Sequence, residues 1–270
     1  MAITSFIPQV WEAKLLTNFR KASVAELVTT APTKIEGNKI IFNRIGASTL
    51  KDYNGSIVWD EVTTTPIELN MDQKKYFAIS VDDVDAVQAA GDVLDTVTED
   101  EAMAAKEVMD SYVLGLYTDV DADNTIGDDT NPVTLDKTNV YDYIVDLGTK
   151  LSKKKVPNSN RFVVINAEVL GLLSKDDRFT SNPTVLENGV VEGQKINNMQ
   201  VVVSEEIPNV NGKLKIIALH KSAIGFGKQI ENTEAIRLQN AFADGVRGLF
   251  VYGAGVLRPE AMAVLTATIA

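Results

Sequence analysis

The stretch DVLDTVTEDEAMAAKEVMDSYVLGLYT, residues 92–118, is the longest window of the chain that keeps one helical period. Its apolar residues recur every three or four positions, which places them along one stripe of an α-helix. The stripe comprises Leu94, Val97, Ala104, Ala105, Val108, Met109, Tyr112 and Leu116. Because no proline or glycine interrupts this window before Gly115, we predict one helix of ~40 Å at a rise of ~1.5 Å per residue. A capping box of Thr98 and Glu101 marks an alternative start or a kink.

Acidic residues concentrate in this helix and its flanks. Residues 81–130 contain fifteen Asp and Glu and one base, Lys106, so this segment carries −14 while the whole chain carries −11. We expect the carboxylates of the helix to face solvent, away from the apolar stripe, with Asp95, Glu99 and Asp110 among them. Such a surface repels phosphate, which argues against nucleic-acid binding by this region.

Composition excludes several classes of protein. At 270 residues and 45% hydrophobic content, the chain can build one large domain or two with a proper core. No apolar run reaches the ~20 residues that span a bilayer, and the N-terminal residues lack a signal-peptide pattern, so we expect no membrane span and no secretion. The absence of cysteine excludes disulfides, thiolate zinc sites and cysteine nucleophiles, and a single histidine, His220, excludes sites that need two imidazoles.

One acidic segment partly matches a calcium-binding loop. Asp119, Asp121 and Asp123 occupy the first three ligand positions of the pattern. Asn124 stands where the loop requires glycine, and Thr130 stands where it requires the bidentate glutamate. We therefore interpret the segment as a solvated acidic turn.

No other motif assembles a catalytic, cofactor or metal site. His220 follows an apolar strand without a nucleophile motif, so we expect it to bond to the backbone at the strand end. Residues 225–228, GFGK, lack the spacing of a phosphate loop and are expected to form a turn. We therefore predict that the protein is not an enzyme and needs no cofactor or metal.

The first 81 residues predict two extended features. Residues 1–31 carry apolar and aromatic side chains that must be buried against their own domain or a neighbour, among them Phe6, Ile7 and Trp11. Residues 34–81 predict two strands that flank a polar, turn-rich excursion. This arm has little apolar material of its own to fold on, so it is poorly suited to a monomer.

The rest of the chain mixes helices and strands, which predicts an α+β fold. Residues 141–151 mark a second amphipathic helix that closes with four lysines, where the helix dipole favours cations. Asn166 can cap a third helix after the strand RFVVI, and Asn197-Asn198 can turn a strand pair. Further strands are expected at 214–220, 234–238 and 246–257, with a short apolar tail to Ala270.

Five strings of the sequence together resemble the major capsid proteins of tailed bacteriophages. They occur in the family's order and cover the chain from Ser5 to Met262. The strings are SFIPQVWEAKLL (5–16), QKKYFAISVDDVDAVQA (73–89, ahead of an acidic helix that ends in MDSYVLGLY), RFVVINAEVLGLLSKDDRF (161–179), GQKINNMQVVVSEEIP (193–208) and DGVRGLFVYGAGVLRPEAM (244–262).

The resemblance implies the tailed-phage major capsid fold, an α+β fold, and a division of the chain into domains. Residues 1–33 would form an N-terminal arm, residues 34–81 an extended two-stranded loop, and residues 92–118 the spine helix of a peripheral domain. The peripheral domain would comprise 82–138 and 240–270, and the axial domain 139–239.

The resemblance also implies a function. The chain would be a structural subunit that self-assembles as pentamers and hexamers into the icosahedral head shell of a tailed phage. The shell would enclose double-stranded DNA without specific binding and without a membrane, and it would be assembled in the bacterial host cytoplasm. The alternative is an encapsulin-like nanocompartment shell, which encloses a cargo enzyme in place of a genome.

Partners and contact residues follow from the same resemblance. Because the arm starts within a few residues of Met1, we expect a separate scaffolding protein, together with a portal and, as in some relatives, decoration proteins. Some relatives crosslink a loop lysine to an asparagine of a neighbour, but nothing in the sequence identifies a partner for Lys51. The candidate subunit contacts on the arm and loop are Phe6, Ile7, Trp11, Lys51, Tyr53 and Trp59, with Trp59 as the aromatic anchor.

Overall fold

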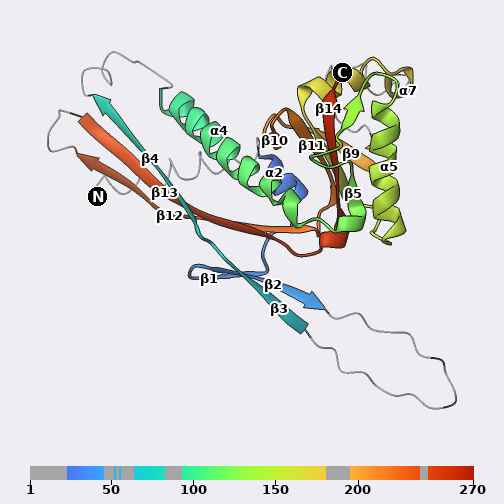
Figure 1. The fold of residues 1–270 in the computed structure, drawn as a ribbon. Coiled ribbons are helices and arrows are strands. Elements are labelled where there is room, and N and C mark those ends of the chain that lie inside the picture. The colour runs from blue at the N-terminus through green and yellow to red at the C-terminus, as the bar shows by residue number, and fades with distance from the viewer. Residues whose placement is uncertain are drawn as a thin grey trace.

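The computed structural model describes residues 23–45, 52, 55, 64–82, 93–180, 195–237 and 243–270. These residues form three parts: a mixed β-sheet accompanied by helices, a long narrow antiparallel sheet beside a long helix, and a three-stranded arm that projects from the body (Figure 1). None of the helices in these ranges is both long and apolar enough to cross a membrane.

The mixed sheet has eight strands and holds most of the core. Its path is β5-β14-β11-β7-β9-β8, with β10 beside β11 and β6 beside β14. The inner strands are largely apolar because both of their faces are covered: all five residues of β7 are buried, and so are six of the eight in β11. Arg161 of β7 and Lys215 of β11 are charged and are buried with them. The strands are β5 (Thr125–Ile126), β6 (Val133–Leu135), β7 (Arg161–Ile165), β8 (Lys195–Ile196), β9 (Met199–Val203), β10 (Asn209–Val210), β11 (Lys213–His220) and β14 (Met262–Ile269).

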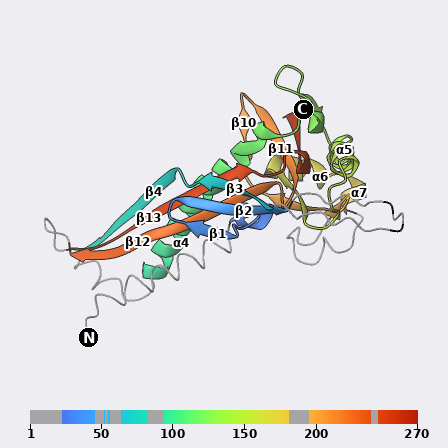
Figure 2. The ribbon, with the colours of Figure 1, turned by 90° about the horizontal axis from the view of Figure 1, so that it is seen from below.

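Three helices, α5 (Val140–Lys153), α6 (Ala167–Leu173) and α7 (Asp177–Thr180), lie at the same end of the molecule as this sheet (Figure 2). The predicted apolar stripe of α5 is buried in the core. The predicted cap of α6 is also present, since Asn166 Oδ1 accepts a hydrogen bond of 3.0 Å from the Val169 amide.

The narrow sheet has the antiparallel order β12-β13-β4, with β12 at Ile224–Arg237, β13 at Ala243–Val256 and β4 at Gln73–Asp82. The long helix α4 (Val93–Leu114) lies beside it and passes into a 3₁₀ turn, η2 (Gly115–Asp119), at the glycine where the sequence first allows a break (Figure 1). The helix therefore occupies nearly all of the predicted window.

The arm is a separate antiparallel sheet of β1 (Lys34–Glu36), β2 (Lys39–Ile45) and β3 (Thr64–Asn70), in the order β1-β2-β3. A short helix, α2 (Val24–Val28), precedes it and packs beside α4. Two further 3₁₀ turns, η3 (Ala122–Asn124) and η5 (Pro259–Ala261), join the parts.

Three expectations about strands were wrong. The run predicted as one returning strand is divided: β3 ends at Asn70, and β4 leaves the arm to pair with β13. The short apolar tail is β14, which pairs with β11 over six residues, so residues 243–270 are divided between the two sheets. Residues 225–228 do not turn but lie inside β12. In each case the decisive neighbour is a strand that is distant in sequence.

The burial of α4 also differs from the predicted stripe. Val108 is 42% exposed, whereas Val113 and Leu114 are buried. Asp110, which we expected in solvent, is fully buried. The reason is that α4 contacts two elements, β13 and α2, so a second part of its circumference is covered.

Candidate functional site

The arm is rooted on four glycines, which we call the glycine platform: Gly225 and Gly227 of β12, and Gly253 and Gly255 of β13. Gly225 pairs with Gly255, and Gly227 pairs with Gly253. Because paired residues and alternate residues of a strand share one face of a sheet, the four glycines leave a flat patch of bare backbone. The patch lies where the arm meets the narrow sheet.

The platform exists because the arm approaches too closely for any side chain. A Cβ built on any of the four glycines would lie under 3 Å from an atom of the arm root. On β12, a Cβ on Gly225 would lie 2.5 Å from the Phe42 ring, and one on Gly227 would lie 2.6 Å from Ile40 Cγ2. On β13, a Cβ on Gly253 would lie 2.5 Å from the Asn70 carbonyl oxygen, and one on Gly255 would lie 2.8 Å from Leu69 Cδ. These glycines are thus required by close approach and not by a positive φ angle.

The side chains that sit on the platform form a small core of their own. Ile40 and Phe42 of β2 and Met71 after β3 are at most 5% exposed, and they cluster with Val251 of β13. Ile40 and Phe42 reach the same face because they are two residues apart on one strand. The root is therefore held by apolar burial, while β1 is exposed along its length.

A polar contact ties the root to the long helix. The Tyr112 hydroxyl of α4 donates to Asp72, which lies between β3 and β4, over 3.4 Å. Burial, followed by the charge of Asp72, raises the pKa of Tyr112, so the hydroxyl stays a donor at neutral pH. Tyr112 also packs edge-on against Tyr252 of β13 with ring centroids 5.5 Å apart. The arm, the narrow sheet and α4 thus meet at one junction.

Asp110 holds the segment that leads into the arm. Its carboxylate accepts hydrogen bonds from the Val24 amide at 3.1 Å, the Ala25 amide at 2.8 Å and the Ser23 hydroxyl at 3.1 Å. These amides are among the first of α2 and have no partner within that helix. Burial raises the pKa of Asp110, although the three hydrogen bonds oppose the shift. The buried carboxylate is therefore a cap supplied by another helix.

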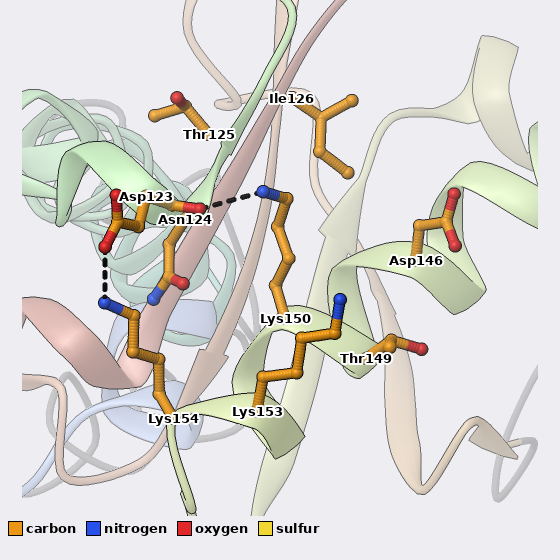
Figure 3. Close-up of a pocket in the computed structure, with 9 residues that line it drawn as sticks. All are labelled: Asp123, Asn124, Thr125, Ile126, Asp146, Thr149, Lys150, Lys153 and Lys154. Carbon is orange, nitrogen blue, oxygen red and sulfur yellow. Dashed lines mark hydrogen bonds and ion pairs between the residues drawn. The ribbon is translucent and has the colours of Figure 1, made fainter.

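Carboxylates of the acidic segment 119–131 form ion pairs with lysines of the same chain, and Figure 3 shows the pair of Asp123 with Lys154. Lys154 lies 3.0 Å from a carboxylate oxygen of both Asp121 and Asp123, and Lys215 lies 2.5 Å from Asp129. Asn124, at the position where a calcium loop needs glycine, is buried and donates to the Glu260 and Met262 carbonyls. Within the described residues, no group of three or more potential ligands could hold a metal ion.

His220 lies at the end of β11, as predicted. Its Nδ1 accepts from the Ser222 amide at 3.1 Å and lies 2.8 Å from the Ser222 hydroxyl. Burial lowers its pKa, and Arg161 lowers it further, so the ring is neutral. These contacts with Ser222 give His220 a structural role at the end of the strand.

The six contact candidates named from the sequence all lie outside the described residues; they are Phe6, Ile7, Trp11, Lys51, Tyr53 and Trp59. The platform was missed, although a signal for it exists: the pattern Gly-x-Gly occurs in two strands that pair with each other. Alternate glycines on paired strands indicate a place where another backbone approaches.

Comparison with known proteins is consistent with this architecture. The family described as "Phage capsid protein" matches residues 67–265. A solved structure from Mycobacterium phage Che8 is 29% identical, covers 85% of each chain and has a TM-score of 0.63. No curated protein matches the chain.

Two further structures share the fold at lower identity. The capsid structure of cyanophage P-SCSP1u is 17% identical, with a TM-score of 0.64 over 92% of this chain and 89% of that one. The holo-SrpI encapsulin complex from Synechococcus elongatus is 14% identical, with a TM-score of 0.58 over 91% of this chain and 86% of that one.

Proposed function

This chain belongs to the phage capsid protein family and is a major capsid shell protein, and we propose that it closes an icosahedral head around double-stranded DNA as pentamers and hexamers. The observation that supports this proposal most is the arm, which is anchored firmly at its root and projects away from the body (Figure 1). A projecting arm with little core of its own gains stability by lying on a neighbour.

The rigidity of the root supports the same proposal. A shell closes only if each contact is made at a reproducible angle, because heterologous contacts that do not close produce open filaments. The glycine platform, the small core on it and the contact of Asp72 with Tyr112 all restrict the direction of the arm. We infer that the arm reaches a neighbouring subunit in a defined direction.

Domain roles are proposed from the same layout. We assign α4 and the narrow sheet to a peripheral domain, and the eight-stranded sheet with α5, α6 and α7 to an axial domain near the local symmetry axis. β14 belongs with the axial group because it pairs with β11. The extended loop would begin and end with the arm strands and would not include β4.

The charge distribution supports an inner wall that confines DNA without gripping it. The segment with −14 would repel phosphate, so a genome could enter without adhering to the shell. We propose no enzymatic role, assembly in the bacterial host cytoplasm, and scaffolding, portal and decoration proteins as partners.

Expression in bacteria, followed by electron microscopy and sedimentation with and without a candidate scaffolding protein, tests the proposal. We expect closed shells of uniform size built from one subunit. Shells that copurify with an enzyme cargo would favour the encapsulin-like alternative, and a protein that stays monomeric under all assembly conditions would contradict both.

A further inference from the structure

A lysine-lined hollow lies between α5 and the segment of η3 and β5 (Figure 3). It has a volume of about 570 Å³. Asp146, Thr149, Lys150 and Lys153 line it from one side and follow the spacing i, i+3, i+4, i+7, which is a second stripe of α5. The core stripe of the same helix lies elsewhere on its circumference, so the hollow is a surface feature with its own pattern.

The wall opposite α5 is held in place by lysines. Lys154 bridges Asp121 and Asp123 at 3.0 Å each, and Lys150 donates over 2.8 Å to the Asp123 backbone carbonyl. The ion pairs raise the pKa of Lys154 and lower the pKa of Asp121, so both groups stay charged at neutral pH. A ligand that enters the hollow therefore meets a surface that is already ordered.

Two of the cations remain available to a ligand. Lys150 donates to a neutral carbonyl oxygen, and Figure 3 draws Lys153 extending into the hollow with no dashed line to another residue. Among the ion pairs within the described ranges, none joins a carboxylate to Lys150 or Lys153. The helix dipole favours lysines near the end of α5, but it does not explain why two of them converge on a walled hollow.

We propose that this hollow receives carboxylate side chains from a second copy of the chain in the assembled shell. The inference rests on the proposed function, since it requires subunits to meet. The chain carries −11 overall and −14 in residues 81–130, so the acidic surface that a neighbouring copy can offer to the hollow lies in that segment. Lys150 and Lys153 outnumber the Asp146 carboxylate on the α5 wall, so that wall keeps a net positive charge that is complementary to such a surface. Each pair contributes little alone, but the contact is repeated around every ring.

Zero-length carbodiimide crosslinking of assembled shells tests the contact directly. Shells mixed from isotope-labelled and unlabelled subunits distinguish crosslinks between chains from crosslinks within a chain. We expect mass spectrometry to find Lys153 or Lys150 joined to an Asp or Glu of another subunit, and to lose this product when shells are dissociated first. Crosslinks only to Asp146 or Asp123 of the same chain would overturn the inference.

Charge reversal supplies an independent readout. Lys153→Glu should raise the subunit concentration needed for assembly by about two- to thirtyfold, the range for losing an exposed pair and gaining a repulsion. Lys153→Arg should assemble as the wild type does. Lys175→Glu is the matched control, because Lys175 is exposed on the same part of the molecule and does not line the hollow.

The outcomes separate this inference from the proposed function. If the wild type forms shells and Lys153→Glu assembles no differently from Lys175→Glu, only the hollow has been misassigned. If Lys153→Glu forms normal shells that retain less duplex DNA, the hollow faces the genome and the inference is wrong. If the wild type forms no shells, the proposed function fails first.

Discussion

Replacing Gly253 by alanine tests whether the glycine platform sets the direction of the arm. The new Cβ would lie 2.5 Å from the Asn70 carbonyl oxygen and 2.9 Å from Met71 Cα. Ordinary van der Waals contact needs about 3.4 Å or more, so the arm root must move by roughly 1 Å. Both atoms belong to the backbone, so no side-chain rotation can relieve the clash.

The magnitude follows from two estimates. Overpacking costs ~1–3 kcal/mol of folding free energy. In a chain of roughly this size, each 1 kcal/mol lowers Tm by ~2–4 °C, so we expect the Tm of Gly253→Ala to fall by ~2–12 °C. The effect on assembly should be larger, because every arm in the shell is displaced. A loss of ~1.4 kcal/mol per arm contact reduces its affinity tenfold, so the yield of closed shells should fall by about tenfold or more.

Differential scanning calorimetry of the subunit and sedimentation of assembly mixtures measure the two effects. Gly255→Ala meets only the end of the Leu69 side chain, which can rotate away, so its effect should be smaller. Gly171→Ala in α6 meets nothing within 4 Å and should assemble normally, with a stability gain of ~0.5–1 kcal/mol. Wild-type shell yield and Tm for Gly253→Ala would refute the reasoning.

Four further predictions concern Asp110, the loop and the charge. Asp110→Ala should lower the free energy of unfolding by ~1–3 kcal/mol in urea titrations, because it leaves the α2 amides unsatisfied. Burial raises the pKa of Asp110, so its contribution to stability should fall as pH rises from the ordinary carboxyl range through the raised pKa; Lys106 and Glu206 are the charged groups nearby. If the free energy of unfolding of Asp110→Asn changed with pH as steeply as that of the wild type, this account would be contradicted. Replacing residues 46–63 with a short Gly-Ser hairpin should leave a folded subunit by circular dichroism that forms no closed shells, and normal particles on a sucrose gradient would exclude the idea. Trp59→Ala should lower the thermal stability of shells but not of free subunits, as light scattering during heating can report. Purified subunits should show no binding to duplex DNA by fluorescence anisotropy at physiological salt, and moderate salt should raise the assembly yield by screening repulsion; micromolar affinity that weakens steeply with salt would count against an inert inner wall.

The elements with strong local patterns were predictable from the sequence. The period of residues 92–118 predicted α4, the stripe ending in lysines predicted α5, and the apolar runs predicted β7, β11 and much of β13. The turn at Asn197-Asn198 was also predictable, because both residues have positive φ and asparagine tolerates that conformation well. In these cases the information lies within a few residues of the element that it specifies.

Features that depend on distant partners were decided only by the tertiary structure. The sequence of β14 resembles a short apolar tail, and it forms a strand because β11 supplies its hydrogen-bond partners. The sequence of β4 continues the alternation of β3, but β4 pairs with β13 in another sheet. Asp110 has the local signature of a solvent-exposed carboxylate and is buried because Ser23 and the start of α2, more than 80 residues earlier, supply three donors. The glycine platform also depends on a distant segment, because these strand glycines are required only where the arm root approaches their backbone. Local periodicity thus determined which segments form helices and strands, whereas hydrogen-bond satisfaction and close packing between distant segments determined how those elements were joined.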